Sequence, residues 1–399
     1  MSPRLAQRMH VVKPSAIREL LQLGADPSIV SFGGGYPDDS LFPLEHLEAV
    51  FHAAIADRGR ESLQYTVSNG IPKLREQVAE RMGRDGVACS ADEVLILQGG
   101  QQGLDLVAKL LIDKGDVIVT ENPTFLGALI AFNPCEPRYA AVAMDGAGMD
   151  MDDLERTLER HPGAKLLYTV PDFQNPTGVT LSLPRRQRLI ELANRFDVMV
   201  LEDTPYREIR YEGASLPTLK SLDTEGRVIY LGSFSKILAP GLRLGWAVAS
   251  EELIQQLGLL KLAADTQCST LNMHAVSIFL DRYDIDAHIA LIRETYRRKK
   301  NLMLDTIRST FPGDVSFTDP SGGLFTWLTF PAGFDAARFM LERALPEAKV
   351  AYVPGATFFP VEQEANHARV SYSTQQDEAI VRGISALGGL LRSESQQVA

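Results

Sequence analysis

A chain of 399 residues that is 45% hydrophobic and 23% charged can bury a large core and suggests two or three domain-sized units. The formal net charge of −11 argues against a general binder of nucleic acid or of anionic membranes, so we expect neither partner. The three cysteines, Cys89, Cys135 and Cys268, have no disulfide or metal spacing, and residues 1–13 contain no continuous apolar stretch. We therefore expect a cytoplasmic protein without a bound metal, a targeting segment or a membrane span.

Short apolar runs rich in β-branched residues alternate along the chain with helical patterns. The expected strands are 94–97, 117–120, 166–170, 198–201, 228–231 and 244–249. The expected helices include 104–112, 151–160, 184–195 and 251–262. This alternation predicts an α/β fold with a large domain, in which helices flank a mostly parallel sheet. A long helical pattern at about 285–309 and weaker strand signals at 325–330 and 368–373 predict a second, smaller domain.

Polar residues follow several of the expected strands, where the carboxyl ends of parallel strands meet and ligands bind. Asn175 follows the strand at 166–170, and Asp203 follows the strand at 198–201. The turn Gly99-Gly100-Gln101-Gln102 lies between the strand at 94–97 and a helix, whose free N–H groups and dipole favour a phosphate. These positions predict a ligand site at one edge of the sheet.

Lys236 ends the run Ser233-Phe234-Ser235-Lys236, and Arg243 follows seven positions later. A lysine that is crowded by polar and cationic groups at a strand end can lose its proton and attack a carbonyl. The serines and the arginine offer donors of the kind that hold a phosphate. Pyridoxal 5'-phosphate has both the carbonyl and the phosphate, and a buried Asp203 can keep its ring nitrogen protonated. Taken alone, the motif is also compatible with a solvated surface lysine.

The combined motifs resemble the fold-type I pyridoxal-phosphate aminotransferases of class I/II, in particular the branch of α-aminoadipate and kynurenine aminotransferases. The matching segments occur in family order and span nearly the whole chain: 31–37, 65–70, 74–75, 99–102, 121–125, 175–178, 202–206, 233–236 with Arg243, and 369–373. The resemblance implies an aspartate-aminotransferase-like fold with a large α/β domain and a smaller α+β domain. Its parts would be an N-terminal segment over the active site (1–45), a large cofactor-binding domain (46–285) and a small C-terminal domain (286–399).

The resemblance also implies roles for the residues of the cofactor site. Lys236 would form a Schiff base with pyridoxal phosphate and carry a proton between the substrate and the cofactor. Asp203 would keep the ring nitrogen protonated, while Asn175 and Tyr206 would donate to the phenolic oxygen. Phe125 would stack on the ring, where many relatives have tyrosine. The phosphate would be bound by the backbone of Gly100 and Gln101 and by Ser233, Ser235 and Arg243.

The implied reaction transfers an amino group from an α-amino acid to a 2-oxo acid, with 2-aminoadipate, glutamate, aromatic and aliphatic amino acids as candidate substrates. Arg369 would bind the substrate α-carboxylate through its two-pronged guanidinium, helped by Asn175. Gly35 and Tyr65 resemble residues of the substrate entrance, and Tyr65 would reach the site of the other subunit in a homodimer with shared active sites. Arg18 resembles an arginine that meets acidic substrate side chains, although it is equally compatible with a solvated arginine.

Two other interpretations remain open on the sequence. A β-lyase, decarboxylase or racemase can share this fold, since fold alone does not fix the reaction. A ligand-sensing domain without enzymatic activity is the second, as in transcription regulators that join such a domain to a DNA-binding domain. Because the family pattern begins by about Ser31, we expect no room for a DNA-binding domain before it.

Overall fold

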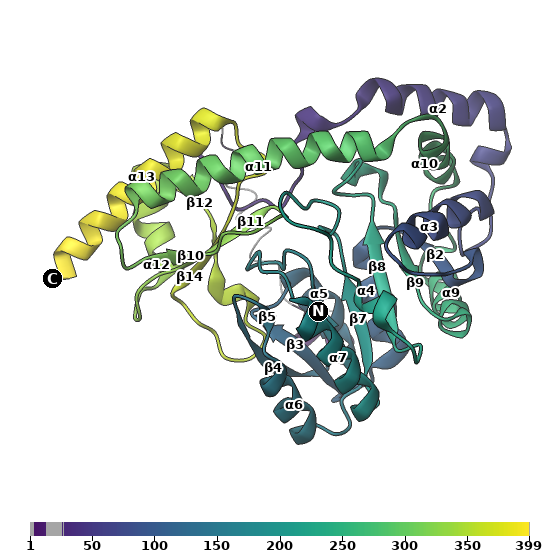
Figure 1. The fold of residues 1–399 in the computed structure, drawn as a ribbon, viewed down its shortest axis with the longest axis horizontal. Helices are drawn as coiled ribbons and strands as arrows, with labels where there is room; N and C mark the ends of the chain where they lie inside the picture. The colour runs from purple at the N-terminus through teal and green to yellow at the C-terminus, as the bar shows by residue number, and fades with distance from the viewer. Residues whose placement is uncertain (1–3, 13–25, 27, 399) are drawn as a thin grey trace.

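The computed structural model describes residues 4–12, 26 and 28–398, and an eight-stranded sheet forms its centre (Figure 1). The strand order is β2-β9-β8-β7-β6-β3-β4-β5. The bounds are β2 (Val94–Leu97), β3 (Val117–Asn122), β4 (Arg138–Asp145), β5 (Gly148–Met149), β6 (Leu166–Thr169), β7 (Met199–Asp203), β8 (Val228–Ser233) and β9 (Gly245–Val248). Strands β4, β3, β6, β7 and β8 pair in parallel, whereas β9 is antiparallel to β8 and β2, and β5 to β4.

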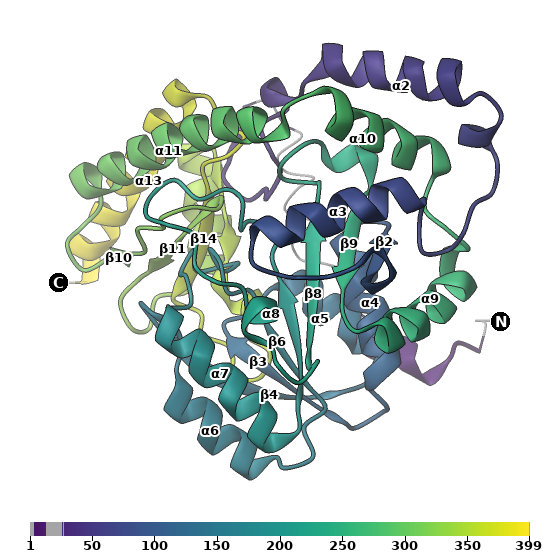
Figure 2. The same cartoon turned by 45° about the vertical axis from the view of Figure 1, so that its right-hand side comes forward.

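Helices cover both faces of this sheet. They are α2 (Leu44–Arg58), α3 (Pro72–Arg84), α4 (Gly100–Leu111), α5 (Leu126–Phe132), α6 (Met151–Arg160), α7 (Leu183–Phe196), α8 (Leu219–Leu222), α9 (Glu251–Asp265) and α10 (Thr270–Arg282). Figure 2 shows α6 and α7 together beside β3 and β4. Along β3, Ile118 packs into one apolar core, while Val117 and Val119 pack into a second core with α6 and α7. Burial of both faces explains why the central strands are continuous apolar runs.

A second sheet of four antiparallel strands lies beside the large one. Its order is β10-β11-β14-β13, with β10 (Ser316–Phe317), β11 (Phe325–Thr329), β13 (Val353–Pro354) and β14 (His367–Ser371). The helices of this part are α11 (Ile285–Thr310), α12 (Ala336–Phe339) and α13 (Asp377–Val398). A short parallel pair joins β1 (Val30–Ser31) to β12 (Val350–Ala351), so the early residues 30–31 attach to the C-terminal part of the chain.

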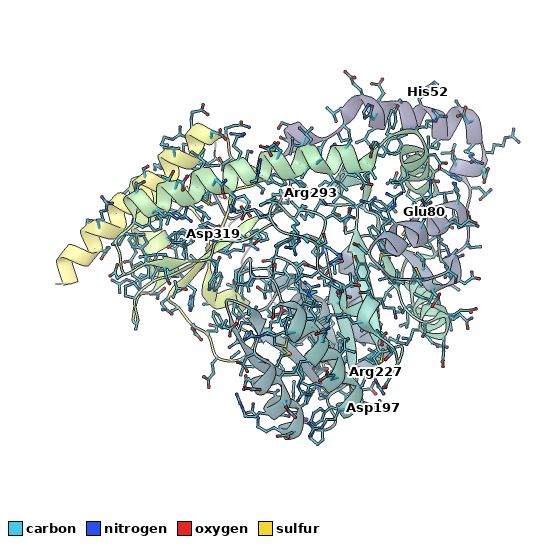
Figure 3. The ribbon with its side chains drawn as sticks, in the orientation of Figure 1. His52, Glu80, Asp197, Arg227, Arg293 and Asp319 are labelled. Carbon is cyan, nitrogen blue, oxygen red and sulfur yellow. The ribbon has the colours of Figure 1, made fainter. Side chains whose placement is uncertain are left out.

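The 26-residue helix α11 extends from α10 to the four-stranded sheet, along α13 (Figures 1 and 2). Near its start, Arg293 donates to the backbone oxygen of Glu208 at 2.6 Å. Further along, Lys300 and Arg308 donate to Asp319 at 3.0 and 2.8 Å, and Figure 3 labels both Arg293 on α11 and Asp319 in the smaller part of the molecule. Polar contacts thus fix α11 to both parts of the molecule.

Short 3-10 helices and one π-helical stretch complete the described chain. They are η1 (Gln7–His10), η2 (Asp39–Leu41), η3 (Glu61–Leu63), η4 (Ala91–Glu93), η5 (Asn133–Cys135), η6 (Pro240–Leu242), the π-helical η7 (Met340–Ala348) and η8 (Gly355–Phe358). No helix within residues 4–12 and 28–398 is long and apolar enough to cross a membrane.

The structure confirms the mostly parallel sheet flanked by helices and the second, smaller sheet region. The strand expected at 244–249 exists, but it is antiparallel to its neighbours. The helix expected at 104–112 begins earlier, at Gly100, because Gly99 adopts a φ of +77° and the chain turns there directly from β2 into α4. The domain limits at residues 45 and 285 stay a prediction.

Candidate active site

The carboxyl ends of β6, β7 and β8 bring three of the predicted residues to one edge of the large sheet. Asp203 is the last residue of β7, Asn175 lies in the loop after β6, and Lys236 lies in the turn after β8. Parallel neighbours end on the same side of a sheet, so these side chains enter one region although they are far apart in sequence.

Lys236 is partly buried, and its Nζ donates to the backbone oxygen of Gly35 at 2.7 Å. Burial, together with the positive charges of Arg369 and Arg243, lowers the pKa of Lys236 to about 8. A much larger fraction of this amine is therefore neutral near pH 7 to 8 than for an ordinary lysine, and the neutral amine is the nucleophile.

Asp203 is buried, and the hydroxyl of Tyr168 donates to its Oδ2 at 2.9 Å. Burial raises the pKa of this carboxyl to about 7, while the hydrogen bond from Tyr168 opposes that rise. In the described part of the chain, no lysine, arginine or histidine forms an ion pair with Asp203. A ligand with a protonated ring nitrogen would supply the missing positive charge.

Asn175 connects two other predicted residues. Its Nδ2 donates to the hydroxyl of Tyr206 at 3.2 Å, and its Oδ1 accepts from Nη1 of Arg369 at 2.8 Å. Burial raises the pKa of Tyr206 to about 12, so its hydroxyl keeps its proton at neutral pH. The amide therefore orients a phenol and a guanidinium at once, and the three side chains come from separate segments of the chain.

Arg369 in β14 is almost fully buried, and its Nη2 donates to the backbone oxygen of Gly33 at 2.7 Å. Its guanidinium carbon lies 4.2 Å from the ring centre of Phe325 and 5.1 Å from that of Phe358. Burial lowers its pKa to about 10, which still leaves the group charged at neutral pH. Its Nε is buried and has no hydrogen-bond partner within the described residues. A buried charged donor of this kind calls for an anionic acceptor.

The first turn of α4 forms a cradle beside Arg243. A Cβ added to Gly99 would lie 2.5 Å from Nη2 of Arg243, so only glycine allows this close approach. A Cβ on Gly100 would meet nothing within 4 Å, which leaves room in front of the helix N-terminus. The side-chain amide of Gln101 donates to the oxygen of Gly127 at 2.8 Å, so its backbone N–H, in the first turn of the helix, is the donor left for a ligand.

Ser233, the last residue of β8, lies next to this cradle. It pairs with Gly245, where an added Cβ would lie 3.2 Å from the nitrogen of Gly100. The backbone N–H of Ser235 donates to the Ser233 hydroxyl oxygen at 3.1 Å, which leaves the hydroxyl hydrogen for a ligand. Phe125 precedes α5 and is partly buried, and Gly127 leaves space for its ring.

The predicted residues of the substrate entrance are placed differently from one another. Gly35 lies at the site, because its oxygen accepts from Lys236 and an added Cβ would lie 2.9 Å from the Phe325 ring. Tyr65 is 80% exposed, and none of its described contacts reaches this site. Arg18 lies outside the described residues.

Sequence reasoning missed several residues of the site. Tyr168 was part of an expected strand, but a tyrosine buried on a central strand needs a partner for its hydroxyl, and that requirement was a usable signal. Gly33 and Phe325 had no such signal, because their contacts with Arg369 join segments that are distant in sequence. Phe358 is closer in sequence, but its contact with Arg369 follows from packing and not from a sequence pattern.

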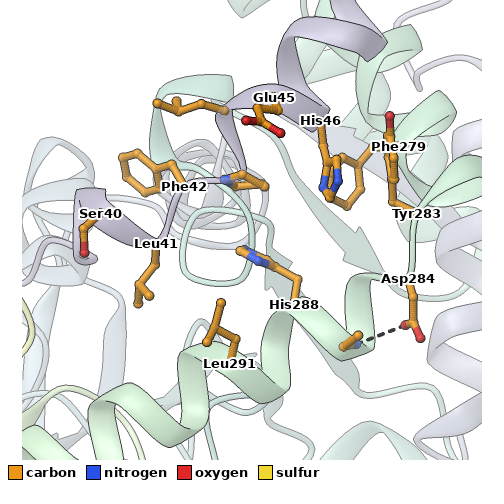
Figure 4. A pocket seen from close by; sticks show the side chains of 13 residues that line it. Ser40, Leu41, Phe42, Glu45, His46, Phe279, Tyr283, Asp284, His288 and Leu291 are labelled. Carbon is orange, nitrogen blue, oxygen red and sulfur yellow. Dashed lines mark hydrogen bonds between the residues drawn. The ribbon is translucent and has the colours of Figure 1, made fainter.

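A separate cavity of about 650 Å³ lies between the starts of α2 and α11 (Figure 4). Among its lining residues are His46, Tyr283 and His288, and the rings of His46 and Tyr283 stack with centres 4.0 Å apart. It contains none of the residues predicted for the cofactor or the substrate. Within the described residues, no group of three or more histidine, cysteine, aspartate or glutamate side chains could hold a metal ion.

Comparison with known proteins assigns the family. Residues 32–387 match the family model described as Aminotransferase class I and II. The chain belongs to the class I and II aminotransferases. This aminotransferase is 38% identical over 391 residues to the aromatic-amino-acid aminotransferase 1 of Thermococcus litoralis, and the match covers 97% of this chain and 93% of the relative.

Two solved structures resemble this aminotransferase along nearly its whole length. Kynurenine aminotransferase from Pyrococcus horikoshii, in complex with PMP, has a TM-score of 0.94 and 37% identity, covering 98% of this chain and 97% of that chain. α-Aminoadipate aminotransferase from Thermus thermophilus, complexed with N-(5'-phosphopyridoxyl)-L-leucine, has a TM-score of 0.90 and 38% identity with the same coverage. The expected fold, the enzyme class and the cofactor pyridoxal phosphate are thereby confirmed.

The site geometry fits this cofactor. Asp203 is a buried acid without a cationic partner in the described chain, Lys236 is an amine of lowered pKa, and Gly99 forms a turn beside the Arg243 guanidinium. When bound, pyridoxal phosphate supplies an aldehyde carbon that accepts the amino group and a ring that withdraws electrons from the substrate α-carbon. The aminotransferase itself supplies binding, orientation and proton movement.

Proposed function

We propose that this aminotransferase passes the amino group of an α-amino acid to a 2-oxo acid, and that Arg369 binds the α-carboxylate of each. The observation that carries the proposal is the buried Nε of Arg369, which has no partner in the described part of the chain. Nε and the second hydrogen of Nη2 lie on one edge of the guanidinium and can donate to both oxygens of one carboxylate. Amino acids and 2-oxo acids share this group, so one contact serves both halves of the reaction.

Within this proposal, Lys236 holds the cofactor through its amine and moves the proton at the substrate α-carbon, since a pKa of about 8 suits a base near neutral pH. Asp203 keeps a proton on the ring nitrogen. Asn175 and Tyr206 donate to the phenolic oxygen of the ring, and Phe125 stacks on the ring face. The phosphate is bound by the backbone of Gly100 and Gln101 together with Ser233, Ser235 and Arg243.

We further propose a broad range of amino-acid substrates. The named relatives act on aromatic amino acids, kynurenine and α-aminoadipate, which supports a site that accepts side chains of different chemistry. Phe325 and Phe358 pack against Arg369 and offer an apolar wall close to the bound α-carboxylate. Gly35 keeps this wall open, because a side chain there would overlap the Phe325 ring.

Arg18 is proposed to select long or acidic side chains such as 2-aminoadipate and glutamate. The test compares kcat/KM for glutamate, 2-aminoadipate, leucine and an aromatic amino acid in the wild type and in Arg18→Ala. A selective loss on the order of 10-fold or more for the two acidic substrates would correspond to one lost charged hydrogen bond of roughly 1.5–3 kcal/mol. An equal loss for all four substrates, or for none, would reject Arg18 as the selector.

We also propose a cytoplasmic homodimer with shared active sites. Leu63, Tyr65 and Val67 are 68%, 80% and 56% exposed and form an apolar stretch that a second subunit would cover. Tyr65 would then reach the site of that subunit. The proposed parts of each subunit are the N-terminal segment 1–45, the large domain 46–285 and the small domain 286–399.

The deciding experiment removes the carboxylate contact. The yellow holoenzyme is mixed with an α-amino acid and, separately, with the matching amine that lacks the carboxylate, and the cofactor absorbance is followed. We expect Arg369→Met to lower kcat/KM for the amino acid on the order of 100-fold while leaving the amine nearly unchanged. Arg382→Met, which removes an exposed arginine from the same C-terminal region, is the matched control and should behave like wild type.

Equal losses for the amino acid and the amine would contradict the role of Arg369.

The mixture of holoenzyme and amino acid also tests the reaction class. A transaminase stops at a stable aminated cofactor and releases one oxo acid per site, whereas steady release of ammonia would identify a β-lyase.

A further inference from the structure

The last two residues of β6 each donate a hydrogen bond to a buried acid on a neighbouring strand. β6 lies between β3 and β7, and the side chains of Tyr168 and Thr169 point to opposite faces of the sheet. The Tyr168 hydroxyl donates to Asp203 at the end of β7, at 2.9 Å, and the Thr169 hydroxyl donates to Glu121 near the end of β3, at 2.6 Å. The donor to Asp203 is therefore built into the rigid centre of the sheet.

Tyr168 has little freedom to do anything else. Its side chain is fully buried, and its ring meets that of Phe132 edge to face, with centres 5.4 Å apart and planes at 80°. Burial and the nearby charge of Asp203 raise its pKa well above 10, so the phenol remains protonated and can only donate to the carboxylate. A fixed donor on Oδ2 restricts rotation of the carboxylate about its terminal bond.

We propose that Tyr168 is a positioning residue of this aminotransferase, which fixes the Asp203 carboxylate in the orientation and charge state that hold the cofactor ring. The proposal rests on the proposed role of Asp203, and Tyr168 acts through that residue alone. The physical reason is that Asp203 has no cationic partner in the described chain, so this neutral donor is the group that opposes the cost of its burial.

The test substitutes Tyr168→Phe, which removes one hydroxyl and keeps the ring in its packing site. The Asp203 carboxyl is titrated by ¹³C NMR in the cofactor-free protein, and its signal is assigned by its loss in Asp203→Asn. Because the lost bond favours the charged carboxylate, we expect the pKa of Asp203 to rise by roughly half to one unit. In the holoenzyme, kcat should fall about 3- to 10-fold with KM within twofold, since the effect belongs to the transition state.

Tyr352→Phe is the matched control, because Tyr352 is equally buried and its hydroxyl donates to the oxygen of Ala336 at 2.7 Å, in the smaller part of the molecule. This control should lose a similar amount of stability and leave the pKa of Asp203 and kcat unchanged. If Tyr168→Phe does not fold, 3-fluorotyrosine at position 168 provides the second measurement. Its more acidic phenol is a stronger donor and should lower the pKa of Asp203.

A pKa of Asp203 that stays the same in both altered proteins would overturn the role of Tyr168. This result is separate from the role of Asp203, because the titration needs neither cofactor nor turnover. Normal turnover of Asp203→Asn would instead reject the assignment of Asp203 itself.

Discussion

At the residue scale, two positive charges act on one amine. Arg369 and Arg243 both disfavour the protonated form of Lys236, and burial does so more strongly than either. The same arginines are the proposed binders of carboxylate and phosphate, so each bound anion would offset part of the charge that activates Lys236. Ligand binding and the basicity of the lysine are therefore coupled by simple electrostatics.

Lys236→Ala should abolish covalent attachment of the cofactor and nearly all turnover while the fold persists. The substitution removes the amine but leaves the neighbouring apolar packing intact. Mass spectrometry after borohydride reduction measures attachment, and circular dichroism reports the fold. A variant that still turned over at the wild-type rate would show that another group serves as nucleophile and base.

Asp203→Asn should reduce kcat on the order of 100-fold or more, with only a modest loss of cofactor affinity. The amide keeps the shape but lacks the charge that holds the ring nitrogen protonated, and that charge matters most in the carbanion-like transition state. Stopped-flow absorbance with an amino-acid substrate measures the rate, and equilibrium dialysis measures affinity. Tight binding with unchanged rate would argue against the role of Asp203.

At the element scale, the loop after β6 is held by a second buried acid. Glu121 near the end of β3 accepts from Gln174 at 3.0 Å, and Gln174 also donates to the oxygen of Pro123 at 2.9 Å. The side-chain oxygen of Gln174 accepts from the backbone N–H of Thr177 at 2.9 Å. Asn175 lies inside this network, so its orientation depends on contacts that do not touch the substrate.

Burial raises the pKa of Glu121 to about 7, which gives a pH-dependent prediction. Its folded pKa exceeds the unfolded value, so the free energy of unfolding loses a contribution as pH rises from about 4.5 through 7. Glu121→Gln removes this loss. The free energy of unfolding of the variant minus that of the wild type should therefore increase between pH 5 and pH 8, by roughly 3 kcal/mol at most. Urea unfolding at both pH values measures the difference, and a pH-independent difference would contradict the raised pKa.

The elements that the sequence predicted are those with local signals. Continuous apolar runs indicated β6, β7 and β8, because strands buried on both faces must be apolar along their length. The strands β10 and β13 have only two residues each, which is too short for a recognisable apolar run. The antiparallel direction of β9 depends on a turn and not on the composition of the strand. In the site, residues that follow strands were predictable. Tyr168 and Gly33 were not predicted. The buried tyrosine indicated that its hydroxyl needs a partner, but only packing determines that the partner is Asp203, and only packing brings the Gly33 oxygen to Arg369.

At the scale of the whole molecule, the proposed sharing of active sites can be tested by mixing subunits. Tyr65→Ala and Lys236→Ala should each be nearly inactive alone. After unfolding and refolding of an equal mixture, half of the dimers contain one of each subunit, and each such dimer has one site with both native residues. Activity should therefore recover to about a quarter of the wild-type value. No recovery would mean that Tyr65 acts in the active site of its own subunit or that the two subunits do not form their active sites jointly.

The long-range hydrogen bonds at residues 33–38 have a consequence for how the chain folds during synthesis. Gly33 accepts from Arg369, Gly35 from Lys236, and Asp38 from Lys299 at 2.5 Å. The first of these spans 336 residues, so the bond between Arg369 and Gly33 forms only after β14 has left the ribosome. The large sheet is complete once β9 has emerged, at Val248. In nascent chains stalled beyond that point, the sheet should thus be protected from protease well before Arg369, the proposed carboxylate binder, is in place.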